Sequence, residues 1–176
     1  MFEQISINDK YFYHTIISYT MLFIWIFLAY AGYRINKKDT NGNLKQKISI
    51  GIILVCIFQE CIDYLNRIIF DPSYTFSIQR DLPLQFCQIS FYCSLICIFL
   101  AKRYININNE KYSLNQFLFD CAFLLGFSGA FQGIITPEFV NINNIVGVIC
   151  IQLQHSLIIL NLIWLMIAYQ YRLKLK

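Results

Sequence analysis

Two residues of the sequence have the chemistry of a nucleophile and a base. Cys87 carries a thiol, which attacks an ester carbonyl once it loses its proton, and the imidazole of His155 can accept that proton. Nucleophile–base pairs also use a third group that orients the base. Glu60 and Asp63 are the carboxylates available for that role. Brought together, these residue types would allow attack on an ester and formation of an acyl thioester on Cys87.

These four residues are distant in the sequence, so the elements that carry them must bring them together. Each lies in one of five apolar runs, at residues 11–33, 48–70, 82–101, 114–136 and 145–171. Each run has the ~17–25 residues that a helix needs to cross ~30 Å of hydrocarbon. A lone strand would leave backbone groups unpaired in lipid. The sequence predicts a single all-α domain over residues 1–176, a polytopic bundle of about five membrane-spanning helices.

The composition agrees with a membrane protein. The 176 residues are 57% hydrophobic and only 14% charged, against about a quarter charged in soluble domains. The seven cysteines are an odd number and fall in or beside apolar runs, which predicts free thiols. The two histidines, His14 and His155, lie in different runs and neither is near a CxxC motif. Neither a metal site nor a cofactor is predicted.

The basic residues predict how the chain is oriented. Eleven of the fourteen lie in the first and third loops and the C-terminal tail, which share one side: Arg34, Lys37, Lys38, Lys45, Lys47, Lys102, Arg103, Lys111, Arg172, Lys174 and Lys176. Basic loops stay cytoplasmic. We therefore expect a multi-pass protein of the cell membrane with its N-terminus outside and its C-terminus inside. These loops lack a nucleic-acid-binding motif and fit anionic lipid instead, so no nucleic-acid partner is expected.

Polar residues of four predicted helices fall in the outer half of the membrane. They are Glu60, Asp63, Cys87, Gln132, Thr136 and His155, with Gln85 at the outer start of the third helix. Burying such groups singly in hydrocarbon is costly. They therefore predict one outward-opening polar pocket, in which Cys87 and His155 are catalytic and the others line the pocket or orient the imidazole.

Packing alone could also account for each of these residues. Cys56, Glu60, Asp63 and Arg67 share one helix face, so Arg67 could pair with either carboxylate and lock the bundle. Gly129 and Gly133 form a GxxxG motif that permits close helix contact. His155 could be a hydrogen-bonded packing residue. His14 and Asp120 lie near run ends and are expected at the interface.

Three stretches resemble a known family. Leu82-Pro83-Leu84-Gln85-Phe86-Cys87 is similar to the "LPLHLC" stretch of the YwaF-like bacterial integral membrane proteins. The residues from Gly129 to Glu138, GAFQGIITPE, resemble their "GalqAllTPdl" stretch, and Gln154-His155-Ser156 resembles their "sHg". The likeness covers roughly residues 48 to 170. This sequence departs from the family in two ways. Gln85 stands where the family has histidine, and the sequence has five apolar runs where family members continue through one or two more helices.

The resemblance has functional implications. The YwaF-like family is similar to a eukaryotic transmembrane acyltransferase family that moves acyl chains between phospholipids, and to small membrane hydrolases of fatty-acid esters. It implies that Cys87 carries the acyl group and that His155 assists it, with membrane lipids as partners and a phospholipid as substrate. The residues of the second helix leave open a small-solute transporter or membrane substrate-binding subunit. A non-catalytic membrane scaffold is the third possibility, and the oligomeric state is not predicted.

Overall fold

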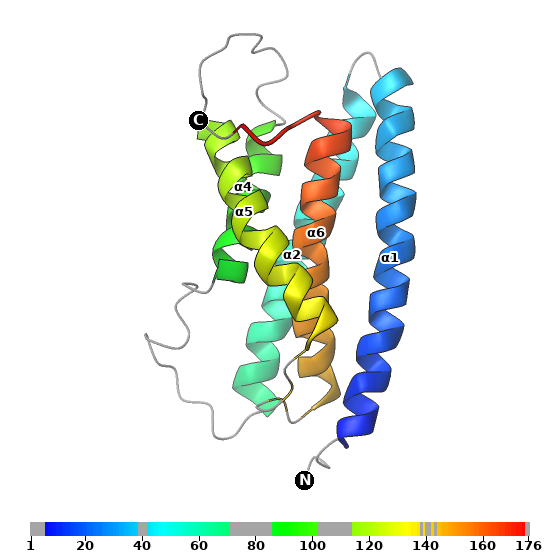
Figure 1. The fold of residues 1–176 in the computed structure, drawn as a ribbon, viewed down its shortest axis with the longest axis vertical. Coiled ribbons are helices and arrows are strands. Elements are labelled where there is room, and N and C mark those ends of the chain that lie inside the picture. The colour runs from blue at the N-terminus through cyan, green and yellow to red at the C-terminus, as the bar shows by residue number, and fades with distance from the viewer. Residues whose placement is uncertain are drawn as a thin grey trace.

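The structure is a computed structural model that describes residues 6–38, 42–70, 86–101, 114–137, 139, 142 and 144–174. In these ranges the regular elements are helices, as expected (Figure 1): α1 (Ile7–Lys38), α2 (Asn43–Phe70), α4 (Phe86–Ala101), α5 (Leu114–Ile135) and α6 (Ile145–Ala168). All except α4 are long and apolar enough to cross a membrane. The predicted first residues of that span, 82–85, lie outside the described residues.

The helix ends differ from those predicted. Helix α1 covers Ile7–Lys38 where 11–33 was expected, α2 begins at Asn43 where 48 was expected, and α6 ends at Ala168 where 171 was expected. Apolar runs mark the hydrocarbon, whereas a helix can continue through the headgroup region with polar residues. The positive charges of Lys37 and Lys38 in the last turn of α1 also interact favourably with the negative C-terminal end of the helix dipole.

Helix α6 is the centre of the bundle. It packs against all four other helices, while α4 packs closely on α5 and α1 makes few contacts with α2. In Figure 1 α6 stands between α1 on one side and the α4–α5 pair on the other. In the most apolar 18-residue stretch of α6, 67% of the residues are buried inside the bundle, whereas the share in the corresponding stretch of α1 is 11%. Lipid therefore covers most of α1, and α6 sets the positions of its neighbours.

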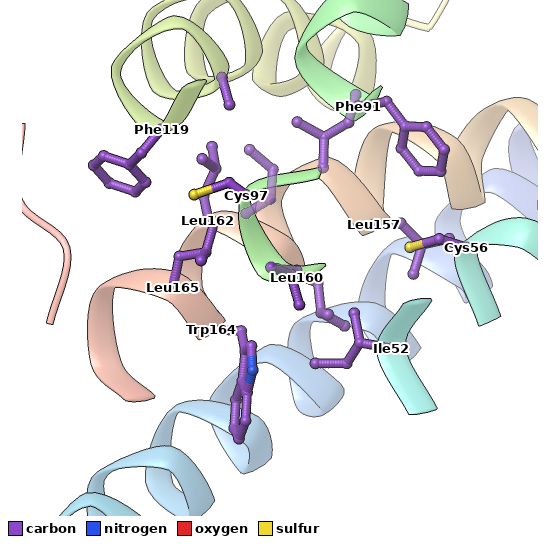
Figure 2. Packing of buried hydrophobic residues seen from close by; sticks show 14 of the residues in the cluster. Ile52, Cys56, Phe91, Cys97, Phe119, Leu157, Leu160, Leu162, Trp164 and Leu165 are labelled. Carbon is purple, nitrogen blue, oxygen red and sulfur yellow. The ribbon is translucent and has the colours of Figure 1, made fainter. Parts of the chain in front are cut away.

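The core combines tight apolar packing with polar bonds between helices. Figure 2 shows Trp164, Leu165, Phe91 and Cys97 among the side chains that fill the space around α6. Lipid tails are as apolar as these side chains, so dispersion and interhelical hydrogen bonds must hold the helices. Three such bonds join α6 to α4, α2 and α1: Asn161 Nδ2 to Ser94 Oγ (3.0 Å), Trp164 Nε1 to Ser49 Oγ (2.9 Å) and Trp25 Nε1 to the Ser156 carbonyl (3.1 Å).

The chain turns at the end of α6 and folds over the first turns of α5. Gln170 has a left-handed backbone (φ 59°), and the Tyr171 N–H then bonds back to the Leu165 carbonyl (3.2 Å). The Lys174 N–H bonds to Asp120 Oδ1 (3.2 Å). Asp120, expected at the interface, is therefore buried beneath this tail.

Candidate active site

One face of α5 carries three glycines where α4 and α6 approach most closely. A Cβ added to Gly126 would collide with Ser90 of α4 and lie 2.7 Å from Ile158 Cγ2 of α6. Gly129 and Gly133 follow at i+3 and i+7, so the three lie on one face. We call them the glycine stripe. The absence of side chains lets both neighbouring helices bring their own side chains onto α5.

Cys87 lies on the middle of this stripe. Its Sγ is 3.0 Å from the position that a Cβ on Gly129 would occupy, and the side chain is partly exposed. All seven cysteines are free thiols, as the sequence predicted. Cys87 therefore has a free, partly exposed thiol at the α4–α5 contact.

His155 reaches the same stripe from α6. Its Cε1 and Nε2 are each 2.9 Å from the position of a Cβ on Gly133. The Ile151 carbonyl, one turn earlier, interacts with the ring, although the buried Nδ1 forms no hydrogen bond of standard geometry. Cβ positions four residues apart on a helix are about 5–6 Å apart. The thiol and the Nε2 edge of the imidazole therefore contact neighbouring positions on one face of α5.

Glu60 binds the two helices that carry these groups. Its Oε1 accepts a 2.7 Å bond from the Tyr92 hydroxyl of α4, and its Oε2 accepts a 3.4 Å bond from Gln154 Nε2 of α6. Tyr92 lies five residues after Cys87, and Gln154 precedes His155. The carboxylate therefore holds α4 and α6 in register near the site, while no described contact joins it to the imidazole.

Asp63 is engaged within α2. Its Oδ2 forms a 2.6 Å ion pair with Arg67 Nη2, and the Asp63 side chain is 8% exposed against 31% for Arg67. This is one of the two pairings weighed from the sequence. The carboxylate faces its own helix partner, so the described structure does not bring it to His155.

The remaining predicted pocket residues lie beside the stripe or outside the described chain. Gln132 and Thr136 are both exposed near the end of α5, where the Thr136 hydroxyl bonds to the Gln132 carbonyl (3.0 Å). They border the stripe without joining the buried bonds of Glu60. Gln85 lies outside the described residues.

His14 of α1, which the sequence predicts near the membrane interface, is buried against other helices near this site. Its side chain is 8% exposed and its ring packs edge-on against Phe139, with centroids 5.7 Å apart. It interacts with the Ile134 carbonyl, next to Gly133, and with the Gln152 side chain. Two histidines therefore flank the C-terminal end of α5, which is the end of the bundle where α1 begins.

Neither Tyr92 nor Ser90 could be singled out from the sequence pattern. Tyr92 stands in an apolar run, where its ring packs like any aromatic, and only its hydroxyl needs a partner. The Ser90 hydroxyl bonds to the Ala122 carbonyl of α5 (2.7 Å). Such a residue could be flagged as a polar group in need of a bond, but its partner depends on which helices are neighbours. Among the described residues no group of His, Cys, Asp and Glu is arranged to hold a metal ion.

Family comparison agrees with the transmembrane architecture. A model of a transmembrane protein family, the TMEM164 family, matches residues 10–176. The chain belongs to the TMEM164 family. The TMEM164 match includes Cys87, His155 and the whole glycine stripe, and it fits a multi-pass membrane protein. No curated protein and no solved structure matches the chain.

Proposed function

We propose that the chain is a membrane acyltransferase or lipid ester hydrolase in which Cys87 is the nucleophile and His155 the general base. The observation that carries this proposal is the contact of Cys87 Sγ and His155 Nε2 with Gly129 and Gly133, one turn apart on α5. Proton transfer requires that the two groups come within hydrogen-bond reach of each other or share one bridging water, and neighbouring contact points on α5 favour such an approach.

The chemistry follows from these two groups. His155 Nε2 takes the thiol proton, and the thiolate attacks the carbonyl carbon of a lipid ester. The tetrahedral intermediate breaks its C–O bond, the leaving alkoxide takes the proton from the imidazolium, and the acyl group stays on Cys87 as a thioester. A lipid hydroxyl or water then gives its proton to His155 and attacks the thioester, which restores the thiol. The first acceptor makes the protein a transferase and the second a hydrolase.

Positioning of the dyad comes from the helices rather than from a carboxylate on the imidazole. His155 is held by its packing on Gly133, because its buried Nδ1 forms no hydrogen bond of standard geometry. Glu60 acts one step away, because it bonds both α4 and α6. The motifs around Cys87 and His155 resemble those of the YwaF-like proteins, a family similar to a eukaryotic phospholipid acyltransferase family, which supports a phospholipid substrate.

The charged residues of α2 do not favour transport. Asp63 is paired with Arg67, and Glu60 is bonded to Tyr92 and Gln154. These contacts explain why α2 can bury its charges without a solute pathway. Apart from the membrane fold itself, no observation on the described residues therefore favours a transporter or a scaffold.

Acyl transfer to the thiol can be tested directly. The full chain in proteoliposomes is incubated with phosphatidylcholine that carries an alkyne-tagged acyl chain, and labelled protein is treated with neutral hydroxylamine, which cleaves thioesters. We expect hydroxylamine-sensitive labelling that Cys87→Ala abolishes and that His155→Gln slows by about 10²–10⁴-fold.

Cys93→Ala is the matched control, because Cys93 is a partly buried thiol on the same helix. It should label like the unmodified chain. Equal labelling of the Cys87→Ala protein, or loss of label in both variants, would contradict the proposal.

A further inference from the structure

A groove lies on the side of α6 that faces away from the glycine stripe. Its walls come from α1, α2 and α6, and its volume is about 600 Å³. It exists because α1 packs against α6 but makes few contacts with α2. We call it the α1–α2–α6 groove.

The walls of the groove are apolar. Met21, Val55, Leu153 and Leu157 are typical of its lining. The polar side chain there, Gln59, donates its amide to the Cys150 carbonyl (3.2 Å). The groove therefore offers a ligand dispersion contacts and no charge.

The dimensions of the groove fit a hydrocarbon chain better than a helix. On α2 the lining extends from Ile48 to Ile62, and on α6 from Val146 to Leu160. Fourteen helical steps span about 21 Å. A helix of that length and about 10–12 Å across occupies roughly 1,600–2,400 Å³, which is more than the groove can hold. A hydrocarbon chain, which is narrower than a helix, is therefore the better fit.

Gly51 keeps the groove open on the α2 side. It lines the groove, and a Cβ added there would meet no atom within 4 Å. A helix-interior glycine is unfavourable relative to alanine. The glycines of α5 are explained by close helix contacts, but Gly51 has no such contact. The absence of a side chain at Gly51 instead widens the groove.

We propose that the α1–α2–α6 groove binds one acyl chain of a bilayer phospholipid. An empty apolar groove would forfeit the contacts of its lining atoms, and the neighbouring bilayer supplies chains that restore them. A phospholipid can keep its headgroup at the interface while one chain enters. A free fatty acid would gain no partner for its carboxylate from these walls. The bound acyl chain would fill the space between α1 and α2, where protein side chains make few contacts.

Photocrosslinking tests this site. The full chain is placed in nanodiscs of phosphatidylcholine doped with phosphatidylcholine that carries a diazirine on one acyl chain. After irradiation the crosslinked peptides are mapped by mass spectrometry. We expect half-buried lining residues such as Leu153 and Ile149 to be labelled at least about fivefold more than the outward-facing Phe23 and Phe27, which are 73% and 68% exposed. Uniform labelling would overturn the proposal.

Variants at Gly51 give the matched comparison. Gly51→Leu should fill the groove and reduce labelling of the lining at least about fivefold, with labelling of Phe23 unchanged. Gly51→Ala should leave labelling of the lining unchanged. Leu54→Phe, which adds bulk to an exposed position of the same helix, should also leave it unchanged. Ile24→Trp narrows the groove from α1 and serves if Gly51→Leu fails to fold.

The outcome separates this site from the proposed chemistry. Cys87→Ala should leave groove labelling intact, since Cys87 lies on α4 and the groove on α1, α2 and α6. A lining that stays unlabelled while Phe23 is labelled would show that something other than a lipid chain, such as a second copy of the protein, fills the groove, and would reject the proposal.

Discussion

Gly133 is the residue at which His155 contacts α5. A Cβ there would lie 2.9 Å from Cε1 and Nε2 of the imidazole, closer than real contacts allow, so Gly133→Ala must push the ring away. Overpacking costs about 1–3 kcal/mol, and alanine recovers about 1 kcal/mol of helix propensity. We therefore expect a net loss of stability under about 2 kcal/mol. Acylation of Cys87 should fall about 10²-fold, because small displacements of catalytic groups are that costly.

Thermal unfolding in micelles and the acyl-labelling rate measure these two effects separately. Gly51→Ala is the control, because a Cβ at Gly51 meets no atom within 4 Å. That variant should gain up to about 1 kcal/mol and label at the normal rate. A Gly133→Ala protein that labels as fast as the unmodified chain would show that the imidazole does not depend on this contact.

Single residues show what the sequence could reveal about the site. Cys87 and His155 could be chosen because few residue types do nucleophilic and base chemistry. The contact of each with its own glycine follows from the rotation of α4 and α6, which residue type does not encode. Glu60 could be recognised as a carboxylate in need of a partner, but Tyr92 and Gln154 become its partners only through the helix register.

At the scale of elements, the turn after α6 determines where the tail goes. Gln170 is held at φ 59°, a left-handed conformation that costs residues with a Cβ about 1–2 kcal/mol. Gln170→Gly removes most of that cost and adds some chain entropy. We expect a net stabilisation of up to about 1 kcal/mol, seen as a higher unfolding temperature in micelles.

The opposite substitution and a helical control test the cause. Gln170→Val places a β-branched residue in the same conformation and should destabilise the fold. Gln132→Gly alters an exposed glutamine inside α5 and should lower stability by about 1 kcal/mol. If Gln170→Gly were as harmful as Gln132→Gly, the left-handed turn would not be the conformation of the folded protein.

The elements themselves could be predicted better than their ends. Each apolar run became a helix, because no other single span satisfies its backbone in lipid. The end of α6 was predicted at residue 171, since Tyr169 and Tyr171 continue the apolar run. The chain turns earlier, because the Tyr169 hydroxyl bonds to Ser49 (2.9 Å) and the Tyr171 hydroxyl accepts a bond from Asn115 (2.5 Å). Both are tertiary contacts.

For the whole molecule, the central position of α6 was not predictable from the pattern of apolar residues. A helix in a membrane is apolar on its lipid face and on its packed face alike, so periodicity does not separate them. Buried small and polar residues give a partial signal. Asn161 and Ser156 of α6 are fully buried, whereas the outward side of α1 is rich in exposed aromatic residues such as Phe23 and Phe27.

The orientation of the bundle is a property of the charge distribution and can be measured. Ser6→Cys should react with a membrane-impermeant maleimide in intact cells, since Ser6 is exposed next to the start of α1. Lys174→Cys, exposed in the tail, should react only after permeabilisation. The unmodified chain gives the background of its own seven thiols. The reverse pattern of accessibility would show that the N-terminus is cytoplasmic.

The same assay can show that the first basic loop sets this orientation. Replacing Lys37, Lys38, Lys45 and Lys47 by glutamine removes charges worth about 1 kcal/mol each near an anionic surface. Lys10, on the other side, directs its Nζ to the Phe139 carbonyl (3.3 Å) and is buried, so its charge competes weakly. We expect the quadruple variant to insert in both orientations. When it also carries Ser6→Cys, maleimide labelling of that cysteine in intact cells should fall. Labelling that stays complete would assign the orientation to the third loop and the tail instead.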